Sequence, residues 1–144
     1  MLEMSAAGTE GEDGLDISLS AATAALEAAL AASERGQNYT RRDFVHAFLA
    51  VTYAYAGQLD KAHETVDAGL RLAEETGSKE GAALCLQAKG RIGALQGDIA
   101  AAERRLRAAA DQFASLGHTA GARRCLEQLA RLRDANVDLP SSSG

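Results

Sequence analysis

The stretch YAYAGQLDKAHETVDAGLRLAEETG, residues 53–77, has a counterpart forty residues later in GALQGDIAAAERRLRAAADQFASLG, residues 93–117. Few residues are identical, but glycines, small residues and large apolar residues recur at a single offset. The matching pairs are Gly57/Gly97, Leu59/Ile99, Ala62/Ala102, Val66/Leu106 and Gly77/Gly117. A period of this length that holds two helices is typical of a stacked helical repeat. Because one helical pair cannot bury both of its faces, we expect successive pairs to pack on each other.

The composition of the chain favours helices throughout. Of its 144 residues, 47% are hydrophobic and 24% are charged, which is the balance of a globular domain with a buried core. Aromatic residues make up only 4% and Trp is absent, whereas the strong helix formers Ala, Leu, Glu and Arg are abundant. We therefore expect an all-α fold whose helices approach closely over alanine.

Apolar residues at helical spacing, interrupted by glycines, predict six helices. Their expected ranges are 17–35, 40–56, 60–76, 79–96, 99–116 and 119–134. Loops of about 2–5 residues force consecutive helices to run antiparallel. Gly36 is expected to cap the first helix, Thr40 with Asp43 to open the second, and Asp60 or a neighbour to cap the third.

The two ends of the chain differ in composition from the repeat. Residues 1–16 predict a disordered acidic leader, residues 17–134 the helical repeat domain, and residues 135–144 a flexible tail. The leader has no basic residue and no apolar segment, so it does not resemble a secretory signal. No apolar run approaches the roughly 18 residues that span a bilayer. We expect a cytoplasmic protein that does not enter the membrane.

Charge is unevenly distributed along the chain. The net charge of −5 argues against a nucleic-acid binder, which needs a basic surface to neutralise phosphates. Residues 1–78 carry 5 basic and 13 acidic side chains, a net charge of −8, and residues 79–144 carry 10 and 7, a net charge of +3. This asymmetry favours head-to-tail contacts between copies or an acidic partner for the C-terminal half. It is equally compatible with solvated surfaces that serve only solubility.

No pattern in the sequence indicates catalysis, a metal or a cofactor. Cys85 and Cys125 occupy the same place in successive repeats, where helices about 8–10 Å apart are too distant for a disulfide. We expect both thiols to be free and buried. The three histidines His46, His63 and His118 fall on different segments without metal-ligand spacing. There is also no phosphate-binding glycine loop and no frame for a nucleophilic serine.

The spacing resembles the tetratricopeptide repeat. The residues that carry the resemblance in the first unit are Leu49, Ala50, Tyr53, Gly57, Ala62, Val66, Gly69 and Leu70. The second unit matches at Gly90, Gly97, Ala102, Leu106 and Ala109, and departs at Lys89 and Gly93. The forty-residue length is similar to the repeats of MalT-like and LuxR-type bacterial regulators. The resemblance covers residues 17–134 and implies a right-handed α-solenoid of about six antiparallel helices.

The resemblance also implies a concave groove lined by the first helix of each pair, which binds a peptide or a partner helix. Its lining residues would be Phe44, Ala47, Phe48, Val51, Tyr55, Gln87, Arg91, Arg124, Glu127, Gln128 and Arg131. The family's carboxylate clamp is not expected, because Ala47 and Val51 occupy its positions. An apolar end beside a basic end suits a partner with an apolar anchor and acidic residues. The alternative is that the aromatic residues pack between helices and the arginines are solvated.

Three functions are therefore open at this point. The first is a non-catalytic scaffold for protein–protein interaction. The second is a regulatory or oligomerisation segment of a bacterial signalling or transcription regulator, which forms homo-oligomers through its terminal helices. The third is a small-ligand sensor.

Overall fold

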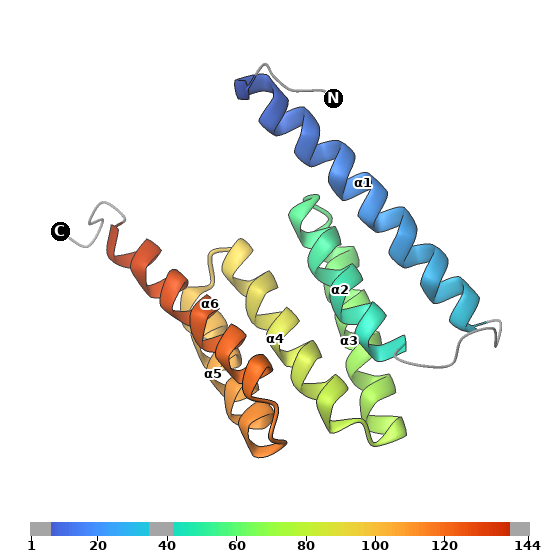
Figure 1. Ribbon diagram of the computed structural model, residues 1–144, viewed down its shortest axis with the longest axis vertical. Coiled ribbons are helices and arrows are strands. Elements are labelled where there is room, and N and C mark those ends of the chain that lie inside the picture. The colour runs from blue at the N-terminus through green and yellow to red at the C-terminus, as the bar shows by residue number, and fades with distance from the viewer. Residues whose placement is uncertain (1–6, 35–41, 139–144) are drawn as a thin grey trace.

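The computed structural model describes residues 7–34 and 42–138, which form six helices and no strand (Figure 1). The helices are α1 (Ala7–Glu34), α2 (Arg42–Tyr55), α3 (Leu59–Thr76), α4 (Lys79–Leu95), α5 (Ile99–Ser115) and α6 (Thr119–Asp138). The all-α class and the packing of consecutive helices that the repeat predicted are confirmed.

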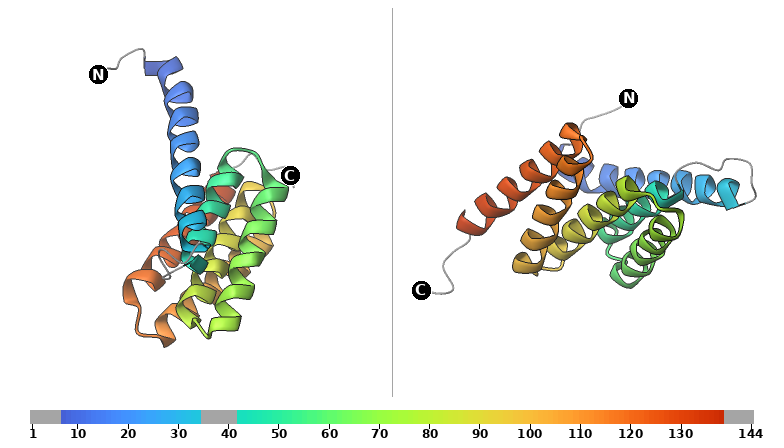
Figure 2. Two further views of the ribbon diagram at one scale, coloured as in Figure 1. Left: turned by 90° about the vertical axis from the view of Figure 1, so that its right-hand side faces the viewer. Right: turned by 90° about the horizontal axis from the view of Figure 1, so that it is seen from below.

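The helices stack in a row, with α1 at one end and the α5–α6 pair at the other (Figure 1). Each helix packs on its neighbours in the chain, and α2 also packs on α4. In Figure 1, α2 and α6 lie in front of α3 and α5, and the view from below in Figure 2 separates the same two sides. We call α2, α4 and α6 the inner layer and α3 and α5 the outer layer. The right-handed twist of this stack stays a prediction.

Glycine closes each turn between α2 and α6, and polar side chains open two of the helices. Gly97 has a φ of +86°, which residues with a Cβ rarely adopt. Ser78 accepts a hydrogen bond from Gly81 N at 3.0 Å at the start of α4, and Asp98 accepts one from Ala101 N at 3.2 Å at the start of α5.

The predicted helix caps agree only in part with the structure. The cap of α3 was expected at Asp60 or a neighbour, and the structure places Gln58 at the N-cap position without a capping side-chain hydrogen bond. Asp60 instead lies in the first turn of α3, where the helix dipole favours a carboxylate. The caps expected at Gly36 and Thr40 fall outside the described residues.

The buried core forms two clusters along the row. The first joins α2, α3 and α4 around Leu49, Val66, Cys85 and Ile92. The second joins α4, α5 and α6 and includes Ala83, Ala109, Ala110, Phe113 and Cys125. Alanines supply many of the buried positions, so neighbouring backbones lie close together, as the composition suggested.

Both end helices extend beyond their predicted limits. Helix α1 begins at Ala7, ten residues before the predicted start, so residues 7–16 of the expected leader are helical. The sequence offers one reason, because Glu10 falls in the first turn, where the helix dipole favours an acidic residue. Helix α6 continues to Asp138, past the predicted end at residue 134. Residues 1–6 and 139–144 lie outside the described part of the chain.

Candidate binding groove

The inner layer places equivalent residues of successive repeats side by side. Because α3 and α5 reverse the chain direction, α2, α4 and α6 run in the same direction (Figure 1). Residues forty apart, such as Phe48, Ala88 and Gln128, therefore come to neighbouring positions. One turn along a helix adds a residue of the same face, as with Ala47 and Val51. The period of the repeat and the period of the helix together build one continuous surface.

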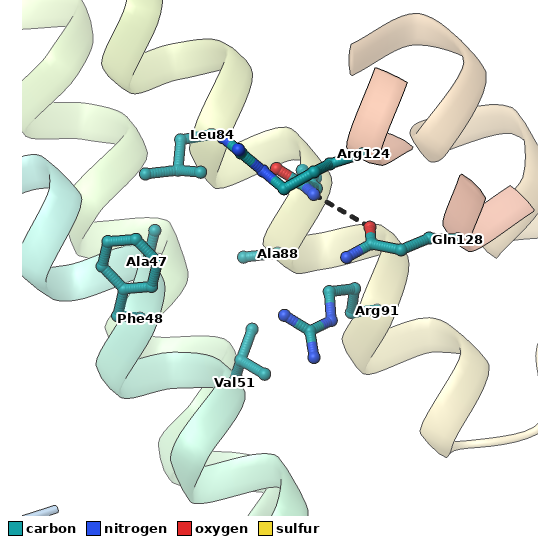
Figure 3. A pocket seen from close by; sticks show the side chains of 9 residues that line it. Ala47, Phe48, Val51, Leu84, Ala88, Arg91, Arg124 and Gln128 are labelled. Atoms are coloured by element: carbon teal, nitrogen blue, oxygen red, sulfur yellow. Dashed lines mark hydrogen bonds between the residues drawn. The ribbon is translucent and has the colours of Figure 1, made fainter. Parts of the chain in front are cut away.

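A hollow of about 180 Å³ lies on this surface between the three inner helices (Figure 3). It is lined by Ala47, Phe48, Val51, Leu84, Gln87, Ala88, Arg91, Arg124 and Gln128. The predicted residues among them are Ala47, Phe48, Val51, Gln87, Arg91, Arg124 and Gln128. The structure thus brings most of the predicted groove residues around one depression, which we call the first hollow.

One side of the first hollow is apolar. Ala47, Phe48 and Val51 come from α2, and Leu84 and Ala88 from α4 (Figure 3). Ala47, Val51 and Ala88 are buried, whereas the Phe48 ring is 52% exposed. A half-exposed phenylalanine beside buried aliphatic side chains gives an apolar partner a surface to contact.

The floor of the first hollow holds a buried amide. Gln87 is only 5% exposed, and its Nε2 donates a hydrogen bond to Gln128 Oε1 at 2.9 Å. Gln87 Oε1 is buried and has no hydrogen-bond partner. Turning over both amides exchanges oxygen and nitrogen, yet one polar atom of Gln87 still lacks a partner. A buried polar group without a partner is destabilising, so Gln87 costs the fold some stability at this position.

The other side of the first hollow is basic. Arg91 Nη2 donates a hydrogen bond to the Tyr55 hydroxyl at 3.2 Å, and its guanidinium lies 5.7 Å from the centroid of the Tyr55 ring. Among the described residues, no carboxylate forms a salt bridge with Arg91, Arg124 or Arg131. Their guanidinium groups therefore keep their capacity to bind a carboxylate in two-point geometry.

A second hollow of about 280 Å³ continues the first between α4 and α6, which pack less closely on each other than α2 and α4 do. Its lining residues are Tyr55, Arg91, Ala94, Leu95, Leu106, Gln128, Arg131 and Leu132. Arg91 and Gln128 line both hollows, so the two form one groove. This second hollow contains Tyr55 and Arg131, two further residues of the predicted groove. Tyr55 and Leu95 are 49% and 44% exposed, which extends the apolar surface.

Two predicted groove residues line neither hollow. Phe44 is half-buried in the first turn of α2, and Glu127 is exposed on α6. Sequence reasoning missed Leu84 and Ala88, which line the first hollow from α4. The repeat offset could have found both, because they lie forty residues after the predicted Phe44 and Phe48.

The groups with the most reactive chemistry are buried away from the groove. Cys85 and Cys125 are free and fully buried. Burial raises the pKa of the Cys85 thiol to about 12, with a further contribution from the charge of Asp43. Burial likewise raises the pKa of Cys125 to about 11, against the opposing effect of Arg124. Both thiols are therefore neutral near pH 7 and are poor nucleophiles.

Comparisons with known proteins identify no relative: no family model, no curated protein and no solved structure matches the chain. Across residues 7–34 and 42–138, no cluster of His, Cys, Asp or Glu has the size needed to hold a metal ion. In the same part of the chain, each helix is too short or too polar to cross a membrane.

Proposed function

We propose that this protein is a cytoplasmic, non-catalytic interaction scaffold of the tetratricopeptide type. Its groove would bind a segment of another protein that carries an apolar anchor next to acidic side chains. The observation that carries the proposal is the first hollow, in which exposed Phe48 faces Arg91 and Arg124, two cations without a carboxylate partner among the described residues.

The size of the first hollow suits a single side chain. It measures about 180 Å³, which is below the roughly 300–1,000 Å³ of pockets for drug-sized ligands. The groove that continues into the second hollow suits the backbone beyond this anchoring side chain.

The basic side of the groove defines the second requirement for the partner. A carboxylate placed one or two turns from the anchor along a partner helix would reach Arg91 and Arg124. Charge-assisted hydrogen bonds between guanidinium and carboxylate are stronger than neutral ones and orient the partner.

The proposal is tested by selecting binders from a random peptide display library with the purified protein. We expect the selected peptides to combine an aromatic or aliphatic residue with nearby Asp or Glu. Arg91→Glu and Arg131→Glu should weaken their binding at least tenfold, because each change replaces an attraction by a repulsion.

The matched control is Arg107→Glu, which makes the same charge change on the exposed surface of the outer helix α5. It should bind the selected peptides like the unchanged protein. Selected peptides without acidic residues, or equal binding by the Arg91→Glu variant and its control, would refute the groove as the binding surface.

A further inference from the structure

Helix α1 packs on α2 in the way that the outer helix α3 packs on α4. Glu27 of α1 and Asp67 of α3 are forty residues apart, and both reach the inner helix that follows. The Tyr53 hydroxyl of α2 donates a hydrogen bond to Glu27, and Lys89 Nζ of α4 donates one to Asp67 at 3.1 Å. Leu26 and Leu30 also pack against the first core cluster. Helix α1 therefore holds the place of an outer-layer helix.

Residues of α1 that correspond to the covered residues of α3 and α5 receive only part of that cover, and Leu26 owes its share to the first core cluster. In α5, Ala102, Leu106 and Ala109 are buried. The inner helix that precedes α5 supplies this cover, and Leu106 lies so close to Gly90 that a Cβ there would stand 3.0 Å from Leu106 Cγ. The equivalent residues of α1 are Ala22, Leu26 and Ala29. Ala22 and Leu26 are only half-buried and Ala29 is exposed, because no helix within the described residues precedes α1.

Helix α6 lacks cover on the complementary face. Leu86 of α4 is half-buried against the second core cluster, whereas its equivalent Leu126 is 51% exposed. Gly90 is buried beneath Leu106, whereas its equivalent Ala130 is exposed. In α4 these positions face the outer helix that follows. Within the described residues no helix follows α6, so the row begins with an outer helix and ends with an inner helix.

We propose that copies of this protein associate head to tail, with α1 of one copy packed antiparallel on α6 of the next. The two helices complete the helical pair that neither copy contains alone, and Leu26 contacts Ala130 as Leu106 contacts Gly90. Charge favours this order: α1 has six acidic and no basic residues, a net charge of −6, and α6 has four basic and three acidic residues, a net charge of +1. The inference does not depend on what the groove binds.

This contact joins two different surfaces, so it leaves one free end on each side and adds copies in an open chain. A contact between two α1 faces, by contrast, would stop at a dimer and bring like charges together. The same continuity of repeats that holds α3 on α4 would then extend across copies.

Two single substitutions test the proposal. Ala29→Glu alters the exposed face of α1 and Leu126→Glu the exposed face of α6, and neither position is buried in the single chain. We expect the sedimentation coefficient of the unchanged protein to rise with concentration and to fall with added salt. Each variant alone should remain a monomer, because every head-to-tail contact would contain one altered face. Ala100→Glu, the same change at an exposed position of α5, should associate like the unchanged protein.

A mixture of the two variants gives the decisive result. Ala29→Glu retains a normal α6 face and Leu126→Glu a normal α1 face, so the mixture should form a 1:1 dimer and no larger species. An unchanged protein that stays monomeric at every concentration would overturn the proposal. So would a mixture that stays monomeric, or an assembly of the unchanged protein that stops at two copies.

Discussion

Compared with each other, the helical pairs α2–α3 and α4–α5 bury the same positions but divide the side-chain bulk differently between their helices. In the first pair the inner helix carries Ala50 and Tyr53, and the outer helix carries Val66, all of them buried. In the second pair the inner helix carries Gly90 and Gly93, and the outer helix carries the larger Leu106. Close packing constrains the volume that the two helices share, so bulk gained on one side is lost on the other.

The junctions between pairs show a second difference at equivalent positions. Gly81 lies in the first turn of α4 and Gly121 in the first turn of α6, and both lack room for a side chain. At Gly81 the obstacle is the carboxylate of Asp43 from α2, and at Gly121 it is the ring of Phe113 from α5. The repeat therefore has a glycine at this position in both pairs, although a different residue leaves no room for a side chain in each.

The largest effect is expected from Leu106→Asp, which replaces the large buried side chain of α5 in the second pair. Leu106 is 2% exposed, and a carboxylate there would have no partner. The loss of packing and the buried charge should cost about 3–5 kcal/mol, against a typical total of about 5–15 kcal/mol. Urea unfolding followed by circular dichroism should show a midpoint at a much lower urea concentration than that of the unchanged protein.

The control for this variant is Leu126→Asp, which introduces the same group at a residue that is 51% exposed. It should keep the helical spectrum and unfold cooperatively. If the Leu106→Asp variant were as stable as this control, the packing of α4 on α5 would not depend on the Leu106 side chain.

A smaller loss is expected from Gly81→Ala at the first junction. An added Cβ would lie 1.7 Å from Asp43 Oδ2 and 2.8 Å from Ser78 Oγ, so these side chains or the helices that carry them must shift. Overpacking of this kind costs about 1–3 kcal/mol, which exceeds the helix propensity gained from alanine. Urea unfolding would measure the loss. Combining the change with Asp43→Ala should recover part of it, and a single variant at least as stable as the unchanged protein would contradict the crossing geometry.

Part of this comparison was accessible from the sequence. The forty-residue offset combined with the helical period predicted which positions share a face, and so placed Val51, Arg91 and Gln128 on one surface. The same reasoning put Cys85 and Cys125 in equivalent places, and the structure buries both as free thiols. The interruption of the apolar pattern at Gly97 indicated a turn, and the structure gives this glycine a φ of +86°. These features depend on local pattern and on the repeat alone.

The remaining features depend on how helices cross. The contact between Asp43 and Gly81 joins residues of α2 and α4 that no local pattern relates. Phe44 lies on the same face of α2 as the groove residues. The helical period predicts that face, but it does not predict how far along α2 the hollow extends. The start of α1 depends on a balance between three glycines, which disfavour helix, and acidic residues that favour an N-terminal turn. The composition of this segment therefore led to the wrong start for α1.

A gain in stability is expected from Gly93→Ala, at the position where the first pair has Tyr53. A Cβ at Gly93 would meet its nearest neighbour, Arg105 Nη1, at 3.6 Å, which is an ordinary contact. Alanine in a helix interior is favoured over glycine by about 0.5–1 kcal/mol. The midpoint of thermal unfolding should therefore rise. Gly97→Val, four residues on, should lower it instead, because φ of +86° costs a branched residue about 1–2 kcal/mol. A fall in the midpoint for Gly93→Ala would mean that the second pair has no spare volume.

The smallest effect concerns the two thiols, which occupy equivalent positions but differ in their charged neighbours, Asp43 and Lys89 near Cys85 and Arg124 near Cys125. The pKa of Cys85 is raised from 9.0 to about 12, by burial and then by Asp43, and that of Cys125 from 9.0 to about 11 by burial, against Arg124. Since the folded protein holds these protons more tightly than the unfolded chain, both contribute stability that is fully present below pH 9 and is lost as the pH rises towards 11 and 12. The free energy of unfolding should decline over this alkaline range. In a Cys85→Ala/Cys125→Ala variant the decline should be less steep, when the free energy of each protein is expressed relative to its own value at pH 7. A decline as steep in the double variant as in the unchanged protein would mean that the two thiols do not cause it.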